Sequence, residues 1–231
     1  MPFERRFAVT RPFGACAGVA LPSTAPVEAA WPASLHPDER AFARALPEAR
    51  RASWIGGRAA LRAALETAGL AVNDPILATA RGAPRLRAGL TGSISHKADL
   101  AVAIAAPAGT PPVTLGIDLE QLRALRADIS TRVLTEAERA ALPPPGLARD
   151  AQVLRLFGAK EAIYKALEPW LQRYIGFQEV EVTLHPDGEL TARLALPAGE
   201  GRFVIELHDL GDLPGPSLVL TAASARLRDP P

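Results

Sequence analysis

The sequence predicts an α+β fold made of two similar halves, each a long helix packed on a small, mostly antiparallel sheet, with a pseudo-twofold axis between them. Two observations favour this fold. Long segments with helical periodicity cover residues 47–68 and 149–172, and each is followed by several short segments that alternate as strands do. Residues 143–146, Pro-Pro-Pro-Gly, form a linker between the two groups. We therefore expect one half over residues 1–120 and the other over residues 121–231.

The composition fits a folded chain with an ordinary core. The chain has 231 residues, of which 48% are hydrophobic, and a formal net charge of +1. Such a balance gives no global basic field for nucleic acid or a membrane surface. The single cysteine, Cys16, excludes an intramolecular disulfide and a Cys-rich zinc site. With no apolar run long enough to span a membrane, we expect a soluble, cytoplasmic monomer.

The elements of the first half follow from local signals. Pro37 and two acids open a short helix that ends near Leu46, and a longer helix ends at Gly69. The glycine pair Gly56-Gly57 interrupts this long helix at a cost of roughly 1 kcal/mol per residue. Strands are predicted near residues 7–9, 76–80, 92–96, 100–106 and 113–120.

The second half repeats the order of one long helix and then strands. A helix is predicted over residues 127–141, ahead of the linker, and the long helix follows over residues 149–172. The turn at residues 185–188, His-Pro-Asp-Gly, separates two strands. The predicted strands cover residues 180–184, 189–196, 203–207 and 218–223.

Two carboxylates share one face of the strand over residues 113–120. Strict alternation places Asp118 and Glu120 on one face and the leucines and isoleucine on the core face. Neighbouring carboxylates repel each other unless a cation lies between them. With a third carboxylate such as Glu161 nearby, oxygen ligands of this kind suit Mg²⁺. The alternative is a solvated strand face with two unrelated acids.

The helix over residues 149–172 has a lysine where a core helix would rarely have one. Lys160 falls inside the apolar arc formed by Val153, Leu156 and Ile163. Glu161 and Lys165 project from an adjacent face, where an i,i+4 pair would contribute only about 0.3–0.5 kcal/mol. That surface pair is the plainer interpretation of the two charges.

Two further groups suggest a site for an anion. Arg51, Arg58 and Arg62 lie close to one face of the long helix, with a glycine gap beside them that could admit a phosphate. Ser95 and His96 lie where a predicted strand leaves for a loop, and they could donate to an anionic ligand. The alternatives are a solvated arginine face and a structural histidine.

Taken together, these segments resemble the motifs of the 4′-phosphopantetheinyl transferases of the two-lobed surfactin/enterobactin type. Residues 116–120, Gly-Ile-Asp-Leu-Glu, and 157–165, Phe-Gly-Ala-Lys-Glu-Ala-Ile-Tyr-Lys, resemble the paired signature of that family. Residues 92–96 resemble its serine–histidine motif. The arginine helix over 51–62 and residues 173–177, Arg-Tyr-Ile-Gly-Phe, are similar to the enterobactin-synthase branch.

The resemblance implies transfer of phosphopantetheine from coenzyme A to a serine of an apo acyl or peptidyl carrier protein, with release of 3′,5′-ADP. It also implies a role for each residue that matches a motif. The implied Mg²⁺ ligands are Asp118, Glu120 and Glu161; the implied coenzyme A contacts are Arg51, Arg58, Ser95, His96, Asp118, Lys160 and Lys165; and the implied catalytic residues are Glu161 as base with Lys160 and Lys165.

Some features depart from the family or leave a choice open. Ala83 stands where many relatives have a basic residue, so a coenzyme A contact at that turn is not expected from its side chain. A non-catalytic module that binds coenzyme A or a carrier protein is the alternative function. The pathway, siderophore or other secondary metabolism included, is left open. Three arginines could form a basic rim for an acidic carrier protein, Arg123, Arg126 and Arg132.

Overall fold

The computed structural model describes residues 2–24, 28–97, 99–196, 202–212 and 218–228. By its contacts the chain divides into two compact units, Met1–Gly109 and Thr110–Pro231. The strand with Asp118 and Glu120, which the sequence suggested as the end of the first half, therefore belongs to the second unit. Throughout the described ranges, no helix combines the length and the apolar character needed to cross a membrane.

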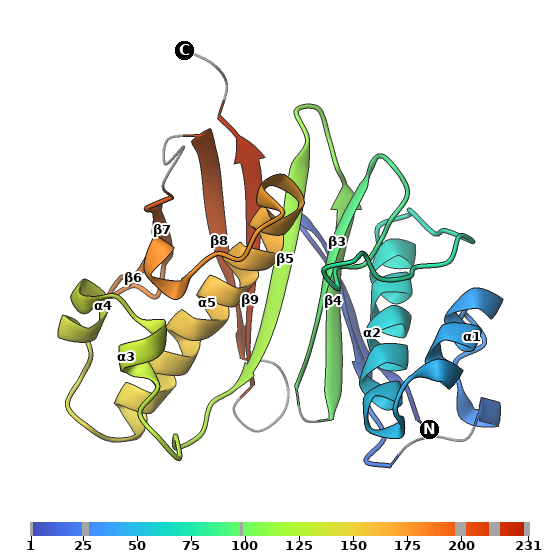
Figure 1. Cartoon of the computed structure of the whole chain (residues 1–231), viewed down its shortest axis with the longest axis horizontal. Coiled ribbons are helices and arrows are strands. Elements are labelled where there is room, and N and C mark those ends of the chain that lie inside the picture. The colour runs from blue at the N-terminus through green and yellow to red at the C-terminus, as the bar shows by residue number, and fades with distance from the viewer. Residues whose placement is uncertain (1, 25–27, 98, 197–201, 213–217, 229–231) are drawn as a thin grey trace. The chain divides into compact units, whose positions relative to one another are not determined.

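An antiparallel sheet of four strands forms the body of the first unit. The strands lie side by side in the order β1-β2-β4-β3 (Figure 1). Cys16 of β2 pairs with Val9 of β1 on one side and with Ile104 of β4 on the other. The bounds are β1 Arg5–Arg11, β2 Gly14–Ala20, β3 Leu90–Lys97 and β4 Leu100–Pro107.

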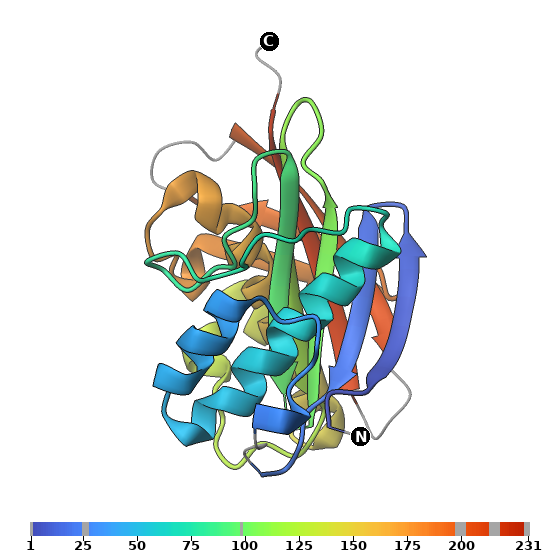
Figure 2. The same cartoon turned by 90° about the vertical axis from the view of Figure 1, so that its right-hand side faces the viewer.

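The long helix of the first unit lies across this sheet, with a shorter helix beside it (Figure 2). Helix α2, Glu48–Thr67, packs against β2 and β4, and α1, Pro37–Ala45, reaches it through Phe42, whose ring stacks on Trp54 at 5.0 Å. An added Cβ at Gly56 would lie 2.1 Å from Leu21 Cδ2. The glycine pair therefore lets α2 approach the sheet, and Leu21 fills the gap that the sequence suggested for a phosphate.

A buried ion pair joins the two helices of the first unit. The Glu39 side chain is fully buried, and its Oε1 accepts hydrogen bonds from Arg62 Nη2 at 2.7 Å and from the Ile76 amide at 2.6 Å. Arg62 also donates to the carbonyls of Val72 and Asp74. Arg62 thus holds the chain that follows α2, which differs from the solvated face considered from the sequence.

Two antiparallel sheets make up the strands of the second unit. One has the order β5-β9-β8, and the other is the hairpin β6-β7 (Figure 1). The prediction of a mostly antiparallel α+β fold is confirmed. The bounds are β5 Val113–Gln121, β6 Val180–Leu184, β7 Leu190–Leu194, β8 Phe203–Asp212 and β9 Leu218–Leu227.

Helix α5, Leu147–Leu171, packs on β5 and β9 and is the centre of the second core. The helix predicted over residues 127–141 is instead two short ones, α3 Ser130–Val133 and α4 Glu136–Ala140. Thr135 breaks the segment because it caps α4: its hydroxyl accepts from the Glu138 amide, and the Glu138 carboxylate accepts from its amide. Two 3-10 turns complete the elements, η1 Glu28–Ala30 and η2 Phe177–Glu179.

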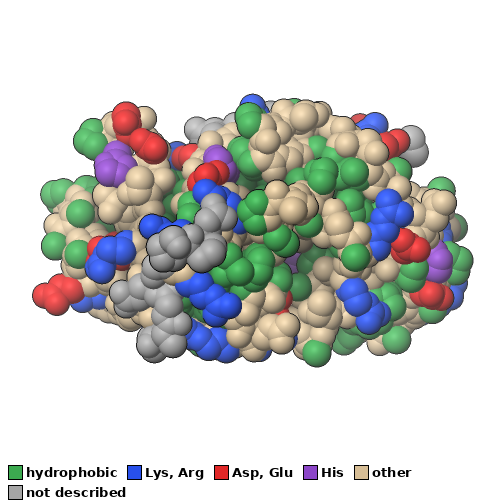
Figure 3. All heavy atoms as spheres, turned by 90° about the horizontal axis from the view of Figure 1, so that it is seen from above, with side chains coloured by type: hydrophobic (Ala, Val, Ile, Leu, Met, Phe, Trp, Pro, Cys, Tyr) green, Lys and Arg blue, Asp and Glu red, His purple; other side chains and the backbone are tan. Residues whose placement is uncertain are grey.

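Most other predicted elements are present with small changes at their ends. The strand near residues 7–9 is β1, but β2 was missed because its small residues, Gly-Ala-Cys-Ala-Gly, carry little strand signal. Residues 76–80 form only an isolated bridge, Ala78 to Pro84, where a strand was predicted. On the face drawn in Figure 3, the lysine and arginine side chains of the described residues lie scattered among apolar and polar ones, as the net charge of +1 suggests.

Candidate active site

Strand β5 turns its small and acidic side chains toward α5. An added Cβ at Gly116 would lie 1.9 Å from the Ala162 carbonyl oxygen, so only glycine fits this contact. Because side chains alternate along a strand, Asp118 and Glu120 share this face with Gly116. The sequence predicted the split between the two faces, but the leucines and isoleucine of β5 lie on the face away from α5.

The two carboxylates of β5 lie under a glycine of α5. Asp118 and Glu120 are 6% and 5% exposed. A Cβ added at Gly158 would lie 3.6 Å from Asp118 Oδ2 and 3.5 Å from Glu120 Cγ. Since Gly158 has no side chain, α5 passes over both acids without covering them with apolar atoms.

Lys165 supplies the cation that two neighbouring carboxylates require. Its Nζ lies 2.7 Å from Asp118 Oδ1 and 2.9 Å from the Ile117 carbonyl oxygen. The Lys165 side chain keeps 30% of its surface exposed, whereas that of Asp118 keeps 7%. The ammonium therefore faces both the buried acid and solvent, as a group that binds an anionic ligand must. From the sequence, the plainer interpretation was that Lys165 pairs with Glu161, four residues earlier on the same helix.

Glu161 lies on the same flank of α5 as Lys165. Four residues separate them, or about 40° around the helix axis, and Gly158 is one turn earlier. Glu161 is partly buried. Asp118, Glu120 and Lys165 therefore lie at the β5–α5 packing, and helical geometry puts Glu161 on the flank of α5 that carries Lys165.

The donor chemistry of this site fits Mg²⁺. Two buried carboxylates on one strand face offer hard oxygen ligands, and the glycine next to them places no side chain against the acids. In the part of the chain that the structure describes, no three His, Cys, Asp or Glu side chains are gathered closely enough to hold a metal ion. The three predicted ligands therefore do not form a preassembled cluster, and the Lys165 ammonium holds Asp118.

Lys160 points away from this site. It lies about 140° around α5 from Lys165, and its side chain is fully buried. Its Nζ donates to Glu138 Oε2 at 2.7 Å, to the Phe177 carbonyl at 2.8 Å and to the Val133 carbonyl at 3.0 Å. Burial lowers the pKa of the ammonium, and the Glu138 carboxylate opposes this shift.

The three donors of Lys160 are thus used by the protein itself. This corrects the expectation that Lys160 contacts phosphate and takes part in catalysis. The sequence did not lead us to Glu138, although the capping box Thr135-x-x-Glu138 was visible in it.

The predicted arginine contacts of the first unit have structural partners. Arg51 donates through Nε to the Leu46 carbonyl and through Nη2 to the Arg44 carbonyl, at the end of α1. Arg58 is 6% exposed; its Nε donates to the Ile76 carbonyl and its guanidinium lies 4.3 Å from the Trp54 ring centroid. Burial lowers the pKa of Arg58 to about 10, so it remains charged near neutral pH.

One nitrogen of Arg58 has an unmet hydrogen bond. Its Nη2 is buried and makes no hydrogen bond to any residue that the structure describes. A buried donor on a charged group is costly unless an acceptor reaches it. Of the two arginines predicted to contact coenzyme A, Arg58 therefore has a side-chain nitrogen without a partner among the described residues.

Ser95 and His96 belong to β3 and not to a loop after it. Because they are adjacent on a strand, their side chains point to opposite faces. Ser95 is 8% exposed, and His96 is exposed near the end of the strand. The two side chains therefore do not form one joint contact on a single face.

The second unit is thus an α+β unit with two buried carboxylates and a partly exposed lysine at the packing of β5 on α5. The model of the 4′-phosphopantetheinyl transferase superfamily matches residues 114–222, and that of the 4′-phosphopantetheinyl transferase N-terminal domain matches residues 38–106. The chain belongs to the 4′-phosphopantetheinyl transferase superfamily, which confirms the resemblance of its motifs and makes it an enzyme of this class.

Two sequence relatives, at 37% and 33% identity, agree with this assignment. The chain is 37% identical over 193 residues to the 4′-phosphopantetheinyl transferase Svp of Streptomyces mobaraensis, which covers 77% of this chain and 75% of that protein. It is 33% identical over 173 residues to PptT of Mycobacterium tuberculosis, over 73% and 70% of the two chains. A solved ACPS–CoA complex of Chronobacterium ammoniagenes is 18% identical, with a TM-score of 0.40 over 50% of this chain and 98% of that one.

Proposed function

We propose that this protein transfers 4′-phosphopantetheine from coenzyme A to a serine of an apo acyl or peptidyl carrier protein, with Mg²⁺, and releases 3′,5′-ADP. The observation that carries the proposal is the contact of Lys165 with Asp118, 2.7 Å long, on the face of β5 that also holds Glu120. It supplies charge of both signs where a pyrophosphate and its metal would bind. Phosphoryl transfer depends mainly on such positioning and charge neutralisation.

The reaction needs one bond formed and one broken. The serine oxygen attacks the phosphorus next to the pantetheine, and the bond from that phosphorus to the bridging oxygen of the pyrophosphate breaks. The electron pair leaves with 3′,5′-ADP. Glu161 takes the proton from the serine hydroxyl, either directly or through a water. Lys165 donates to the pyrophosphate oxygens and offsets the charge that develops there.

The proposed metal ligands are Asp118, Glu120 and Glu161. When bound, Mg²⁺ supplies charge stabilisation for the phosphate oxygens. The glycine at position 158 places no side chain against the two strand acids, and this supports their assignment. Glu161 lies on the flank of α5 nearest to Lys165 and completes the oxygen donors.

The remaining coenzyme A contacts are proposed from the first unit. Arg58 keeps a buried Nη2 donor with no acceptor among the described residues, which suits the 3′-phosphate. Ser95 and His96 follow from the family motif, each as a separate contact from its own face of β3. The Arg51 guanidinium holds the end of α1, so we assign it to the fold.

The carrier protein is proposed to approach the segment after Glu120. Arg123, Arg126 and Arg132 are all exposed there. Carrier proteins are usually acidic, and a basic rim speeds the encounter of opposite charges.

Intact-mass spectrometry tests the transfer. Apo acyl and peptidyl carrier proteins are incubated with this protein, coenzyme A and Mg²⁺, with and without chelator. A gain of one phosphopantetheine that disappears with chelator is expected. No gain on any carrier, with coenzyme A still bound, would instead indicate the non-catalytic binding module.

A pair of variants tests the base. Glu161→Gln should lower kcat by about 10²–10⁴-fold, the usual contribution of a general base. Glu168→Gln, two turns further along α5, is the matched control and should turn over normally. Near-normal turnover of Glu161→Gln would remove Glu161 from this role.

A further inference from the structure

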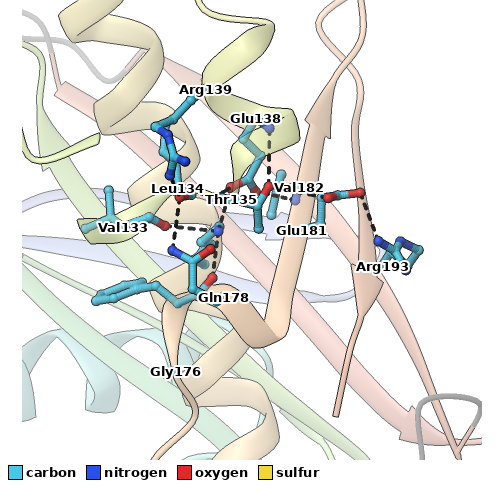
Figure 4. A network of polar contacts seen from close by, with 12 residues as sticks. Val133, Leu134, Thr135, Glu138, Arg139, Gly176, Gln178, Glu181, Val182 and Arg193 are labelled. Atoms are coloured by element: carbon cyan, nitrogen blue, oxygen red, sulfur yellow. Dashed lines mark hydrogen bonds and ion pairs between the residues drawn. The ribbon is translucent and has the colours of Figure 1, made fainter. Parts of the chain in front are cut away.

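A buried polar network surrounds Glu138 of α4 (Figure 4). Its member on α5, Lys160, lies about 140° around the helix axis from Lys165. At its centre the Glu138 carboxylate accepts from Lys160 Nζ and the Thr135 amide through Oε2, and from the Val182 amide through Oε1. The side chains of Lys160 and Glu138 are 0% and 2% exposed. Removal of either member of a charge pair this deeply buried would leave the other charge buried without a partner, which strongly destabilises a protein.

The network joins four short elements to α5. Lys160 donates to the Val133 carbonyl at the end of α3 and to the Phe177 carbonyl in η2, while Glu138 lies in α4 and reaches Val182 of β6. The Gln178 side chain also donates to the Leu134 carbonyl. One ammonium thus fixes the short elements on both sides of α5 in sequence.

The same short elements follow directly on the acidic strand. The segment between Glu120 and α3 is tied to the first turn of α5, where the Asp150 carboxylate accepts from the Leu125 amide at 2.9 Å. Lys160 ties its far end, at Val133. The path of the chain as it leaves Glu120 is therefore held at two points of α5.

On its other side α5 has little freedom to shift. Gly116 of β5 packs directly against the Ala162 backbone, and Thr114 Oγ1 donates to the Ala166 carbonyl at 2.6 Å. Lys160 lies about 160° around the helix from Ala162. The helix is thus held by contacts on two nearly opposite sides. The residue next to Lys160 in the sequence is Glu161.

From this arrangement, and resting on the proposed function, we infer that Lys160 is a positioning residue: its buried bond to Glu138 fixes the rotation of α5 that presents Glu161 and Lys165 to Asp118 and Glu120. It touches neither coenzyme A nor the reacting atoms. A shift of about 1 Å in a catalytic group costs on the order of 10²-fold in rate. This role depends on the pair of Lys160 and Glu138 and not on the lysine charge alone.

The test compares Lys160→Met, Glu138→Gln and the double variant. Lys160→Met leaves the Glu138 carboxylate buried without its cation, whereas the double variant removes both charges and keeps an acceptor for the Val182 amide. Urea unfolding gives the folded fraction of each, and titration calorimetry gives the Kd of coenzyme A. The kcat is then expressed per folded molecule. Glu136→Gln, exposed on the same helix α4, is the matched control for Glu138→Gln.

We expect Lys160→Met to lower kcat by about 10²-fold with the Kd and KM for coenzyme A within about twofold. The double variant should recover most of the unfolding midpoint, because no buried charge is left unpaired, but its kcat should stay low because the bond that fixes α5 is still missing. If Lys160→Met does not fold, the kcat per folded molecule of the double variant tests the inference by itself. Lys165→Met, on the opposite side of α5, should instead weaken coenzyme A binding.

Three results would overturn the inference. One is a Kd for coenzyme A raised about tenfold or more in both Lys160→Met and the double variant, as for a lost phosphate contact. Another is an unchanged kcat per folded molecule in Lys160→Met or in the double variant, which would leave a purely structural role. The third is a double variant that does not fold. Absence of any transfer by the wild-type chain would refute the proposed function, and the unfolding data would still measure the coupling of the pair.

Discussion

The Lys165 ammonium and the Asp118 carboxylate meet at 2.7 Å, with the lysine side chain 30% exposed and the aspartate side chain 7% exposed. The aspartate of the pair is therefore buried, whereas the lysine is partly exposed to solvent. A buried carboxylate needs a cation, and the structure supplies one from α5. In the proposed reaction the same ammonium serves the pyrophosphate, so its loss has two consequences.

Lys165→Met should lower both activity and stability. Removal of one donor to a developing oxyanion costs about 10²–10³-fold in kcat, and Asp118 is left buried without its cation. Adding Asp118→Asn should restore the unfolding midpoint but not the activity. Steady-state kinetics and urea unfolding of both variants measure the two effects. Restored activity in the double variant would show that Lys165 acts only on Asp118.

Two glycines at the β5–α5 contact should respond to alanine in opposite directions. At Gly116 an added Cβ would lie 1.9 Å from the backbone oxygen of Ala162, so alanine should destabilise the protein by about 1–3 kcal/mol or more. At Gly158 the nearest atom would be 3.5 Å away, and alanine in mid-helix should stabilise by up to about 1 kcal/mol. Chemical unfolding of the two variants checks the signs. Equal effects would contradict the close approach of α5 at Gly116.

Charge reversal at Arg126 should affect the carrier protein and not coenzyme A. Arg126 is exposed, and an exposed charge pair contributes up to about 1 kcal/mol, or about fivefold in affinity. Arg126→Glu should therefore raise the KM for the carrier by up to about fivefold at low salt and less at high salt. Arg50→Glu, exposed in the first unit, is the control. An unchanged KM for the carrier would refute the basic rim.

Cys16 should resist thiol reagents in the folded protein. It is 1% exposed in β2, and burial raises the pKa of its thiol from 9.0 to about 12. At pH 8 the reactive thiolate is then on the order of 10⁻⁴ of the total. Labelling should be slow in buffer and fast in guanidinium, followed by absorbance of the released chromophore. In a Thr131→Cys variant, one exposed thiol should react at once and Cys16 should not; two fast thiols would contradict the burial.

Local signals in the sequence were sufficient to predict the helices that carry both units and to propose residues for the site. His36 and Pro37 start α1, Gly69 follows α2, and β6 has the bounds predicted for it, because caps, turns and periodicity act within a few residues. The motifs around Asp118, Glu120, Glu161 and Lys165 also stand in the sequence, since they are contiguous runs of residue types.

Contacts between residues far apart in the sequence could not be predicted from such local signals. The break at Thr135, the packing of Gly56 on Leu21 and the turn of Asp118 toward α5 depend on partners far along the chain. Lys160 is the clearest case: periodicity located it in an apolar arc, but its role depends on Glu138, which is 22 residues away. Burial of a charge is decided by whichever partner the folded chain brings to it, and only the three-dimensional packing specifies that partner.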